Sequence, residues 1–169
     1  MPVAETPNAA TLALCEAIER DDLAGVVAAL EAGADPDPPS NACGDPPMRL
    51  VLQSDHADSL EMLRALLRHG ARPDGMREGV LYTVPVFEAA KWGQLEKLRV
   101  LLAAGADVNG RDPEDEETAL MPAARFGYLE VAKLLVDAGI DVTCRDGAVG
   151  ETALEPALQA DQPGCRAFA

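Results

Sequence analysis

Cysteine and histidine are the residue types that could bind a metal ion or act as nucleophiles in this chain of 169 residues. The histidines, His56 and His69, have no cysteine or acidic residue placed to complete a metal-binding spacing. No two cysteines are separated by the two residues that are typical of zinc and redox motifs, and they stand at Cys15, Cys43, Cys144 and Cys165. A chain of this size does not need disulfides to fold. We therefore expect reduced thiols and no bound metal.

The densest group of carboxylates lies in the run from Asp112 to Glu117, which could in principle bind calcium. The run lacks the alternating ligands and the central glycine of a calcium-binding loop. A solvated turn is the more common role of such a charge run. The sequence also contains no glycine-rich phosphate loop and no nucleophile with a base at a recognisable spacing. We therefore expect no cofactor and no catalytic site, and predict that the protein is not an enzyme.

The charge balance narrows the class of partner. With 29 acidic and 14 basic residues the formal net charge is −15, and such a surface repels nucleic acids and anionic membranes. If charge guides association, the partner is a protein with a basic patch. The alternative is that the acidity serves solubility alone.

The chain shows no targeting or membrane segment. Its N-terminus has neither a basic region nor an apolar run, so it does not read as a signal peptide, and no segment offers the roughly 20 apolar residues of a membrane span. We therefore expect a cytoplasmic protein. Its free use of Ala, Gly, Pro and Arg, with scarce Lys and Ile, is typical of a GC-rich bacterial genome.

Internal repetition organises the chain and supplies the elements that position any binding residue. Similar segments end at Gly33, Gly70, Gly105 and Gly139, which are spaced by 37, 35 and 34 residues. An apolar pattern of helical period precedes each glycine, as in Leu95, Leu98, Leu101 and Leu102. Glycine adopts the left-handed conformation after a last helical turn without a Cβ penalty. These glycines are therefore predicted to be helix C-caps.

A shorter helix is predicted upstream of each long one. It covers residues 85–92 and 119–126 in two of the units, where it is followed by Gly93 and Gly127. Pro85 suits the first helical position, and Thr118 stands where an N-cap is expected. Each unit thus reads as a short helix, a tight turn, a longer helix, a glycine cap and an extended polar connection.

This pattern resembles the ankyrin repeat family, most specifically in the turns at Gly93–Glu96 and Gly127–Glu130 and in the Gly-Ala-Asp-Val-Asn ending at Gly105–Asn109. The resemblance implies an all-α repeat solenoid of four helix-pair repeats plus a truncated fifth C-terminal cap. The repeats cover about 11–37, 47–74, 84–109 and 118–143, the cap covers 152–169, and residues 1–169 form one domain. The first repeat has Asp21-Asp22 in place of the turn glycine, and the second carries an insertion of about three residues near 54–59.

One departure from the family concerns the histidine of its Thr-Pro-Leu-His tetrapeptide. The four repeats replace this histidine with Cys15, Arg49, Phe87 and Met121. The hydrogen bonds that the histidine makes between neighbouring turns are therefore missing, and apolar packing has to compensate.

The resemblance also implies where a partner binds, because turn tips and the exposed edge of the short helices form a concave face in such stacks. Trp92 and Phe126 occupy equivalent positions on this edge, and each follows a cation. Repeated aromatic residues of this kind are typical of binding hot spots, although burial of both rings between repeats is the alternative. The predicted partner-binding residues are Arg77, Tyr82, Lys91, Trp92, Asp112, Glu114, Arg125, Phe126 and Asp146.

The function predicted from these observations is a protein–protein interaction module that holds one folded protein on its concave face and is a monomer when alone. Its sharper form is an inhibitor or immunity protein that neutralises a basic enzyme or toxin. The alternative is a self-assembling scaffold or adaptor with no inhibitory role.

Overall fold

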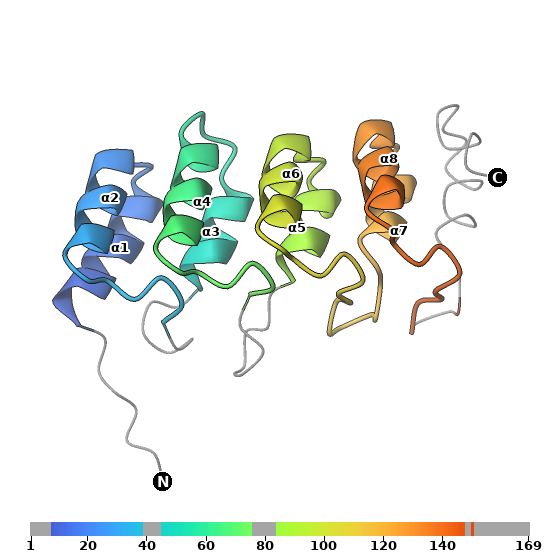
Figure 1. The fold of residues 1–169 in the computed structure, drawn as a ribbon, viewed down its shortest axis with the longest axis horizontal. Coiled ribbons are helices and arrows are strands. Elements are labelled where there is room, and N and C mark those ends of the chain that lie inside the picture. The colour runs from blue at the N-terminus through green and yellow to red at the C-terminus, as the bar shows by residue number, and fades with distance from the viewer. Residues whose placement is uncertain (1–7, 39–44, 76–83, 148–149, 151–169) are drawn as a thin grey trace, which may run out of the picture. The chain divides into compact units, whose positions relative to one another are not determined.

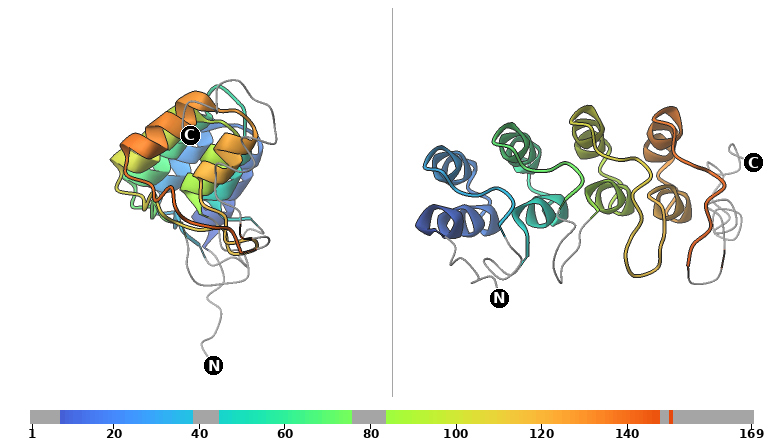
Figure 2. Two further views of the ribbon diagram at one scale, coloured as in Figure 1. Left: turned by 90° about the vertical axis from the view of Figure 1, so that its right-hand side faces the viewer. Right: turned by 60° about the horizontal axis from the view of Figure 1, so that its bottom comes forward.

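The computed structural model describes residues 8–38, 45–75, 84–147 and 150, which form helix pairs (Figures 1 and 2). Two compact units divide the chain, one up to Tyr82 and the other from Thr83. Over the described ranges each unit contains two helix pairs and no strand, apart from an isolated bridge between Arg111 and Thr118. The predicted all-α class of paired helices is confirmed for the described residues. The number of repeats and the single domain over 1–169 stay predictions.

The first unit consists of α1 (Ala9–Glu19) paired with α2 (Leu23–Glu31), and α3 (Pro47–Gln53) paired with α4 (Ser59–Arg68). The first helix of one pair packs on the first of the other, and the second on the second. The Asn8 side chain caps α1 by accepting the Thr11 N–H at 2.7 Å, and Asp22 caps α2 by accepting the Gly25 N–H at 3.0 Å. Side chains such as Leu14, Leu52 and Leu66 are fully buried in this unit.

The second unit repeats the arrangement with α5 (Pro85–Lys91) and α6 (Leu95–Ala103), then α7 (Leu120–Arg125) and α8 (Leu129–Asp137). Here α5 packs on α7 and α6 on α8, around buried residues such as Leu98, Met121 and Leu135. The proline at the start of α5 is confirmed. The predicted N-cap at Thr118 is wrong, because Thr118 pairs with Arg111 and α7 starts without a side-chain cap.

Left-handed residues end the helices where the sequence predicts. Gly33, Gly70, Gly105 and Gly139 have φ between 86° and 95° after the long helices. In the first turn, Asp21 takes the same region with φ 55°, which explains how aspartate replaces the family's glycine. The insertion is also located, since residues 54–58 join α3 to α4 where three residues join each other pair.

The positions of the missing histidines are filled mainly by apolar packing, as expected. Cys15, Phe87 and Met121 are buried, whereas Arg49 is half-buried and pairs with Asp45 at 3.2 Å. The prediction of reduced thiols is wrong for Cys15, which is disulfide-bonded. Cys144 is free.

Hydrogen bonds along the loops link neighbouring pairs within each unit. The Asp37 carboxylate accepts the Arg72 backbone N–H at 2.7 Å, and the Asn109 side chain accepts the Asp141 N–H at 2.8 Å. Asp37 and Asn109 both stand four residues after a capping glycine. A carboxylate and an amide thus perform the same connecting role in the two units.

Burial raises the pKa of Asp37 above its ordinary value of 3.8, and nearby Asp35 adds to the rise, while the hydrogen bond from Arg72 opposes it. The folded chain therefore holds the proton more tightly than the unfolded chain. By linkage, the contribution of Asp37 to the free energy of unfolding falls as pH rises from the unfolded pKa through the folded one. The ionised carboxylate costs stability at neutral pH.

Asp37→Asn should therefore stabilise the fold at pH 7, because the amide oxygen still accepts the Arg72 N–H and there is no charge to desolvate. The group is partly exposed, so the gain should be less than about 1 kcal/mol. It should vanish at a pH below the unfolded pKa, where the wild-type carboxyl is neutral too. Urea unfolding of both chains at the two pH values measures this. Glu114→Gln, which removes a charge from an exposed loop, is the control for the change in net charge alone.

Candidate protein-binding site

Trp92 and Phe126 lie immediately after the two short helices of the second unit, as the C-caps of α5 and α7. Both helices end there because Gly93 and Gly127 follow in the left-handed region, with φ 67° and 74°. The last turn thereby projects each ring outward. Trp92 is 53% exposed and Phe126 is 50% exposed. The alternative in which both rings are buried between repeats is wrong.

Tyr128 contacts Phe126 and the neighbour of Trp92. Its ring centroid is 6.0 Å from that of Phe126, at an interplanar angle of 41°. The same ring lies against Gly93, the neighbour of Trp92, so closely that a Cβ built on Gly93 would be 2.8 Å from it. Tyr128 is itself 36% exposed. We call Trp92, Phe126 and Tyr128 the aromatic surface.

Tyr128 is not among the partner-binding residues that the sequence predicts. The structure gives its ring a packing role against Gly93 together with an exposed face. Its place beside Phe126 could have been predicted from the repeat pattern, because Tyr128 follows Phe126 by two residues in the same turn. Contact with Gly93, which is 35 residues earlier, cannot be read from local spacing.

The two cations beside the rings have partners within the second unit. The Lys91 ammonium lies 5.7 Å from the centre of the buried Phe87 ring, an attractive cation–π geometry. The Arg125 guanidinium pairs with Glu117, whose side chain is almost fully buried. Arg125 therefore compensates a buried charge in addition to lying beside Phe126. An arginine lost from this pair would leave an unpaired carboxylate, which is costly.

Trp92 is also held in place. Its indole N–H donates to a Glu88 carboxylate oxygen at 3.2 Å, one turn earlier on α5. Anchoring of this kind lowers the conformational entropy that a ring loses when a partner orders it. The exposed face of the indole remains available for contact.

The acidic run forms an ordered loop. The Asp112 carboxylate accepts the backbone N–H groups of Glu114 and Asp115 at 3.1 and 3.2 Å, while the Asp112 N–H donates to the Glu117 carbonyl at 2.9 Å. Asp112 is half-buried and Glu114 is exposed. In this loop Asp112 holds the backbone, and Glu114 presents a charge to solvent.

The remaining predicted residues are dispersed. Asp146 accepts the Gly150 N–H at 2.7 Å and thus fixes the loop after α8. Arg77 and Tyr82 lie outside the described ranges. The Tyr128 ring thus contacts Phe126 and lies against Gly93, the neighbour of Trp92, whereas the hydrogen bonds of Asp112 and Glu114 lie inside their own loop.

Within the described ranges, no group of three or more His, Cys, Asp or Glu side chains is arranged to hold a metal ion. Over those same residues, no helix has the length and apolar character needed to span a bilayer.

Comparison with known proteins identifies relatives. The chain is 38% identical over 99 residues to human cyclin-dependent kinase inhibitor 2A, an alignment that covers 59% of this chain and 60% of that protein. Cyclin-dependent kinase 4 inhibitor B from rat and from mouse is 37% identical over 107 residues, covering 60% of this chain and 78% of each relative. The chain thus spans about 60% of the length of the human relative.

The family comparison covers a larger part of the chain. The model for ankyrin repeats, described as three copies, matches residues 57–146 and 86–167. These matches include all four helices of the second unit and α4 of the first. The structure agrees with this match. It contains the helix pairs, the left-handed glycines after the long helices and the loop hydrogen bonds between pairs. The chain therefore belongs to the ankyrin repeat family.

Proposed function

We propose that this chain binds a folded protein through the aromatic surface of its second unit and inhibits that protein by covering it. The observation that carries the proposal is the partial exposure of three rings, Trp92, Phe126 and Tyr128, of which Phe126 and Tyr128 are in contact and Tyr128 lies against Gly93 beside Trp92. Rings of this kind are enriched among the residues that dominate binding energy. The proposal excludes catalysis as the main activity, because the surface offers apolar contact and no reacting group.

Binding is favoured when a partner removes the exposed apolar area of these rings from water. Exposed apolar area that gathers in one place gains free energy when a partner removes it from water, at roughly 25 cal/mol per Å². Trp92 is already held by Glu88 and Tyr128 by the contact with Gly93, so little freedom is lost on binding. A rim of charged groups, here Lys91 and Arg125, is typical of interface centres. We include in this proposal that the partner lies on the predicted concave face and also contacts the loop tips.

The relatives support an inhibitory role. By name, the human, rat and mouse proteins are inhibitors of cyclin-dependent kinases. This favours an enzyme as the partner and makes a protein kinase the first class to test. The neutralisation of a basic toxin, as an immunity protein would do, is supported by the net charge of −15 alone. A cytoplasmic location and a bacterial source also stay predictions.

The alternative is self-assembly, in which exposed apolar residues contact a second copy of the chain. It is favoured by the fact that Val136 and Val142 are exposed too. Light scattering of the purified chain separates the two functions. A monomer supports the binding module, and a concentration-dependent oligomer that is lost on Phe126→Ala supports the scaffold.

Charge should affect the rate of binding if the partner has a basic patch. Exposed carboxylates such as Glu114 would then attract it from a distance, and salt would screen the attraction. The association rate constant should fall steeply between low and physiological ionic strength, while the dissociation rate changes little. Stopped-flow mixing at several salt concentrations measures both rates. An association rate that is indifferent to salt would contradict steering and leave apolar recognition in place.

The experiment that tests the function uses the chain as bait with a matched control. Immobilised wild-type chain and the double variant Trp92→Ala/Phe126→Ala are exposed to extract of the native host, and retained proteins are identified. The proposal expects an enzyme that is retained by the wild type and lost by the variant, and whose purified activity falls when the chain is added. Retention that is equal for both baits, or an activity that the chain leaves unchanged, would contradict it.

A further inference from the structure

We propose that Asn109, in the loop after α6, is a site of spontaneous deamidation, in which water replaces its side-chain amide with a carboxyl group. The chain has three asparagines, Asn8, Asn41 and Asn109, and only Asn109 is followed by glycine. Glycine favours the reaction because it has no Cβ to hinder the approach of its backbone nitrogen to the preceding side chain. Asn109 is not part of the aromatic surface, and the inference does not depend on the proposed function.

The reaction consumes water and releases ammonia. Hydroxide removes the proton of the Gly110 backbone N–H, and the nitrogen attacks Cγ of Asn109. The bond from Cγ to Nδ2 breaks, and the leaving nitrogen takes up a proton from water, which regenerates hydroxide and leaves a cyclic succinimide. Water then opens the ring. Opening at the side-chain carbonyl gives aspartate, whereas opening at the backbone carbonyl gives isoaspartate, in which the main chain runs through the former side chain.

A backbone donor already contacts the oxygen on which charge develops. Asn109 is exposed and lies in a turn, and its Oδ1 accepts the Asp141 N–H at 2.8 Å. The attack on Cγ places negative charge on this oxygen, and a donor that is in place beforehand stabilises such charge. The Asp141 N–H therefore favours the intermediate as well as linking the two helix pairs of the second unit.

The attacking nitrogen is weakly engaged, and the fold requires the glycine that carries it. The Gly110 N–H donates to the Asp107 carbonyl at 3.3 Å, beyond the usual range of about 2.7–3.2 Å for such bonds. A Cβ at Gly110 would come within 2.8 Å of Cγ1 of Val84, which is buried. A larger residue would have to displace this valine, so the packing keeps the reactive Asn-Gly pair in the loop.

The first unit shows that the aspartyl product fits. Asp37 stands at the equivalent position, four residues after a capping glycine. Its backbone N–H donates to the aspartate two residues before it at 3.0 Å, and the N–H of Asn109 does the same at 2.9 Å. Both side chains accept a backbone N–H from the loop of the following pair. Deamidation to aspartate would give the second unit the link that the first unit already has.

The isoaspartyl product differs in its geometry. Its main chain gains a methylene group, and its carboxylate is attached directly to Cα. The carboxylate is therefore one carbon shorter than the asparagine side chain that reaches the Asp141 N–H. The link between the helix pairs would be lost. One product thus keeps the second unit connected, and the other loosens it.

The test incubates the full, folded chain for several days at mildly alkaline pH in water that contains heavy oxygen, followed by digestion in ordinary water and mass spectrometry of the peptides. The peptide that contains Asn109 should give two products, each with one heavy oxygen and a carboxyl group in place of the amide. Conversion should rise with hydroxide concentration. It should be at least about tenfold faster at Asn109 than at the exposed Asn8, because the next residue there, Ala9, has a Cβ.

Two variants separate the reaction from its consequences. Asn109→Gln keeps an amide but would have to form a larger ring, so it should show no conversion at this position. Asn109→Asp represents the aspartyl product and should unfold at the same urea concentration as the wild type. When the incubated wild type is treated briefly with a protease near its urea midpoint, the isoaspartyl peptide should be enriched among the cleaved molecules.

Three results would overturn the proposal. They are an unchanged peptide at Asn109 in the folded chain, equal conversion at Asn8 and Asn109, and conversion that occurs only after urea has unfolded the chain. The last would mean that the loop protects the amide. An Asn109→Asp variant that is as unstable as the isoaspartyl form would overturn the distinction between the two products.

Discussion

Replacing Trp92 or Phe126 with alanine should weaken partner binding by about 2 kcal/mol or more, which is roughly a thirtyfold rise in Kd. Each variant should lose little stability, because about half of each ring is already in water. The affinity is measured by calorimetry against the retained partner and the stability by urea unfolding. Both quantities are needed on the same protein, because a folding defect alone would also lower apparent affinity.

Val142→Ala is the matched control for these variants. Val142 is 52% exposed in the same unit and lies outside the aromatic surface, so its truncation should change neither affinity nor stability by much. A loss of stability in Trp92→Ala or Phe126→Ala with affinity retained would contradict the hot-spot assignment. The loop around Asp112 and Glu114 would then be the next place to look.

The fold was predictable because its signals are local. Leucines at helical spacing and a glycine after the last turn lie within a dozen residues of one another, and the structure places the left-handed glycines where the pattern predicts. The exposure of Trp92 and Phe126 was only half predictable. The repeat register placed them equivalently, but burial depends on the neighbouring pair, and the sequence left both outcomes open.

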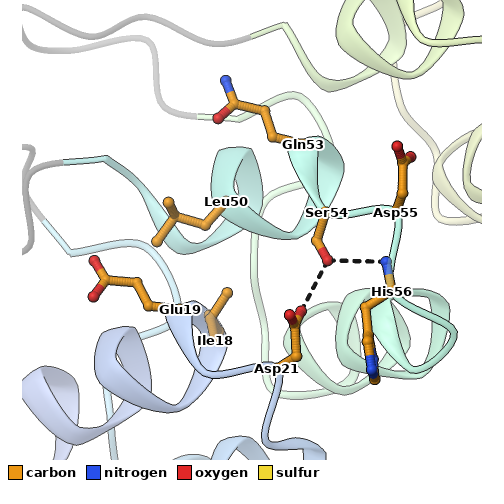
Figure 3. Close-up of a pocket in the computed structure, with 8 residues that line it drawn as sticks. All are labelled: Ile18, Glu19, Asp21, Leu50, Gln53, Ser54, Asp55 and His56. Carbon is orange, nitrogen blue, oxygen red and sulfur yellow. Dashed lines mark hydrogen bonds between the residues drawn. The ribbon is translucent and has the colours of Figure 1, made fainter.

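The parts that sequence reasoning missed depend on contacts between distant residues. The pairing of Arg125 with the buried Glu117, which precedes α7 in the loop, was not predicted. Tyr128 was not predicted to lie in the candidate site, because its contact with Gly93 crosses from one helix pair to the next. The disulfide at Cys15 was missed because a cysteine at a core position gives no spacing signal. The hydrogen bond between Ser54 and Asp21 likewise joins the turns of two different pairs (Figure 3).

Gly93→Ala should destabilise the chain by roughly 2–5 kcal/mol, the largest stability effect that we expect from a single methyl group here. Two costs combine. The residue has φ 67°, a region that costs an alanine about 1–2 kcal/mol. The new Cβ would also come within 2.8 Å of the Tyr128 ring, and overpacking of this kind typically costs a further 1–3 kcal/mol.

Gly105→Ala separates the two costs. Gly105 has φ 90°, and a Cβ there would meet nothing within 4 Å, so its variant should lose the backbone term alone. The difference between the two variants in urea unfolding then measures the contact with Tyr128. A smaller loss in Gly93→Ala than in Gly105→Ala would mean that the Tyr128 ring does not rest on Gly93.

The same pair of variants connects stability to function. A Cβ at Gly93 has to displace the Tyr128 ring, and that ring lies 6.0 Å from the Phe126 ring. The aromatic surface should therefore be disturbed in Gly93→Ala and intact in Gly105→Ala. At a temperature where both variants are fully folded, Gly93→Ala should bind the partner at least about fivefold more weakly, whereas Gly105→Ala should bind as the wild type does. Equal affinities for the two would show that Tyr128 contributes to packing only, and would confine the binding contact to Trp92 and Phe126.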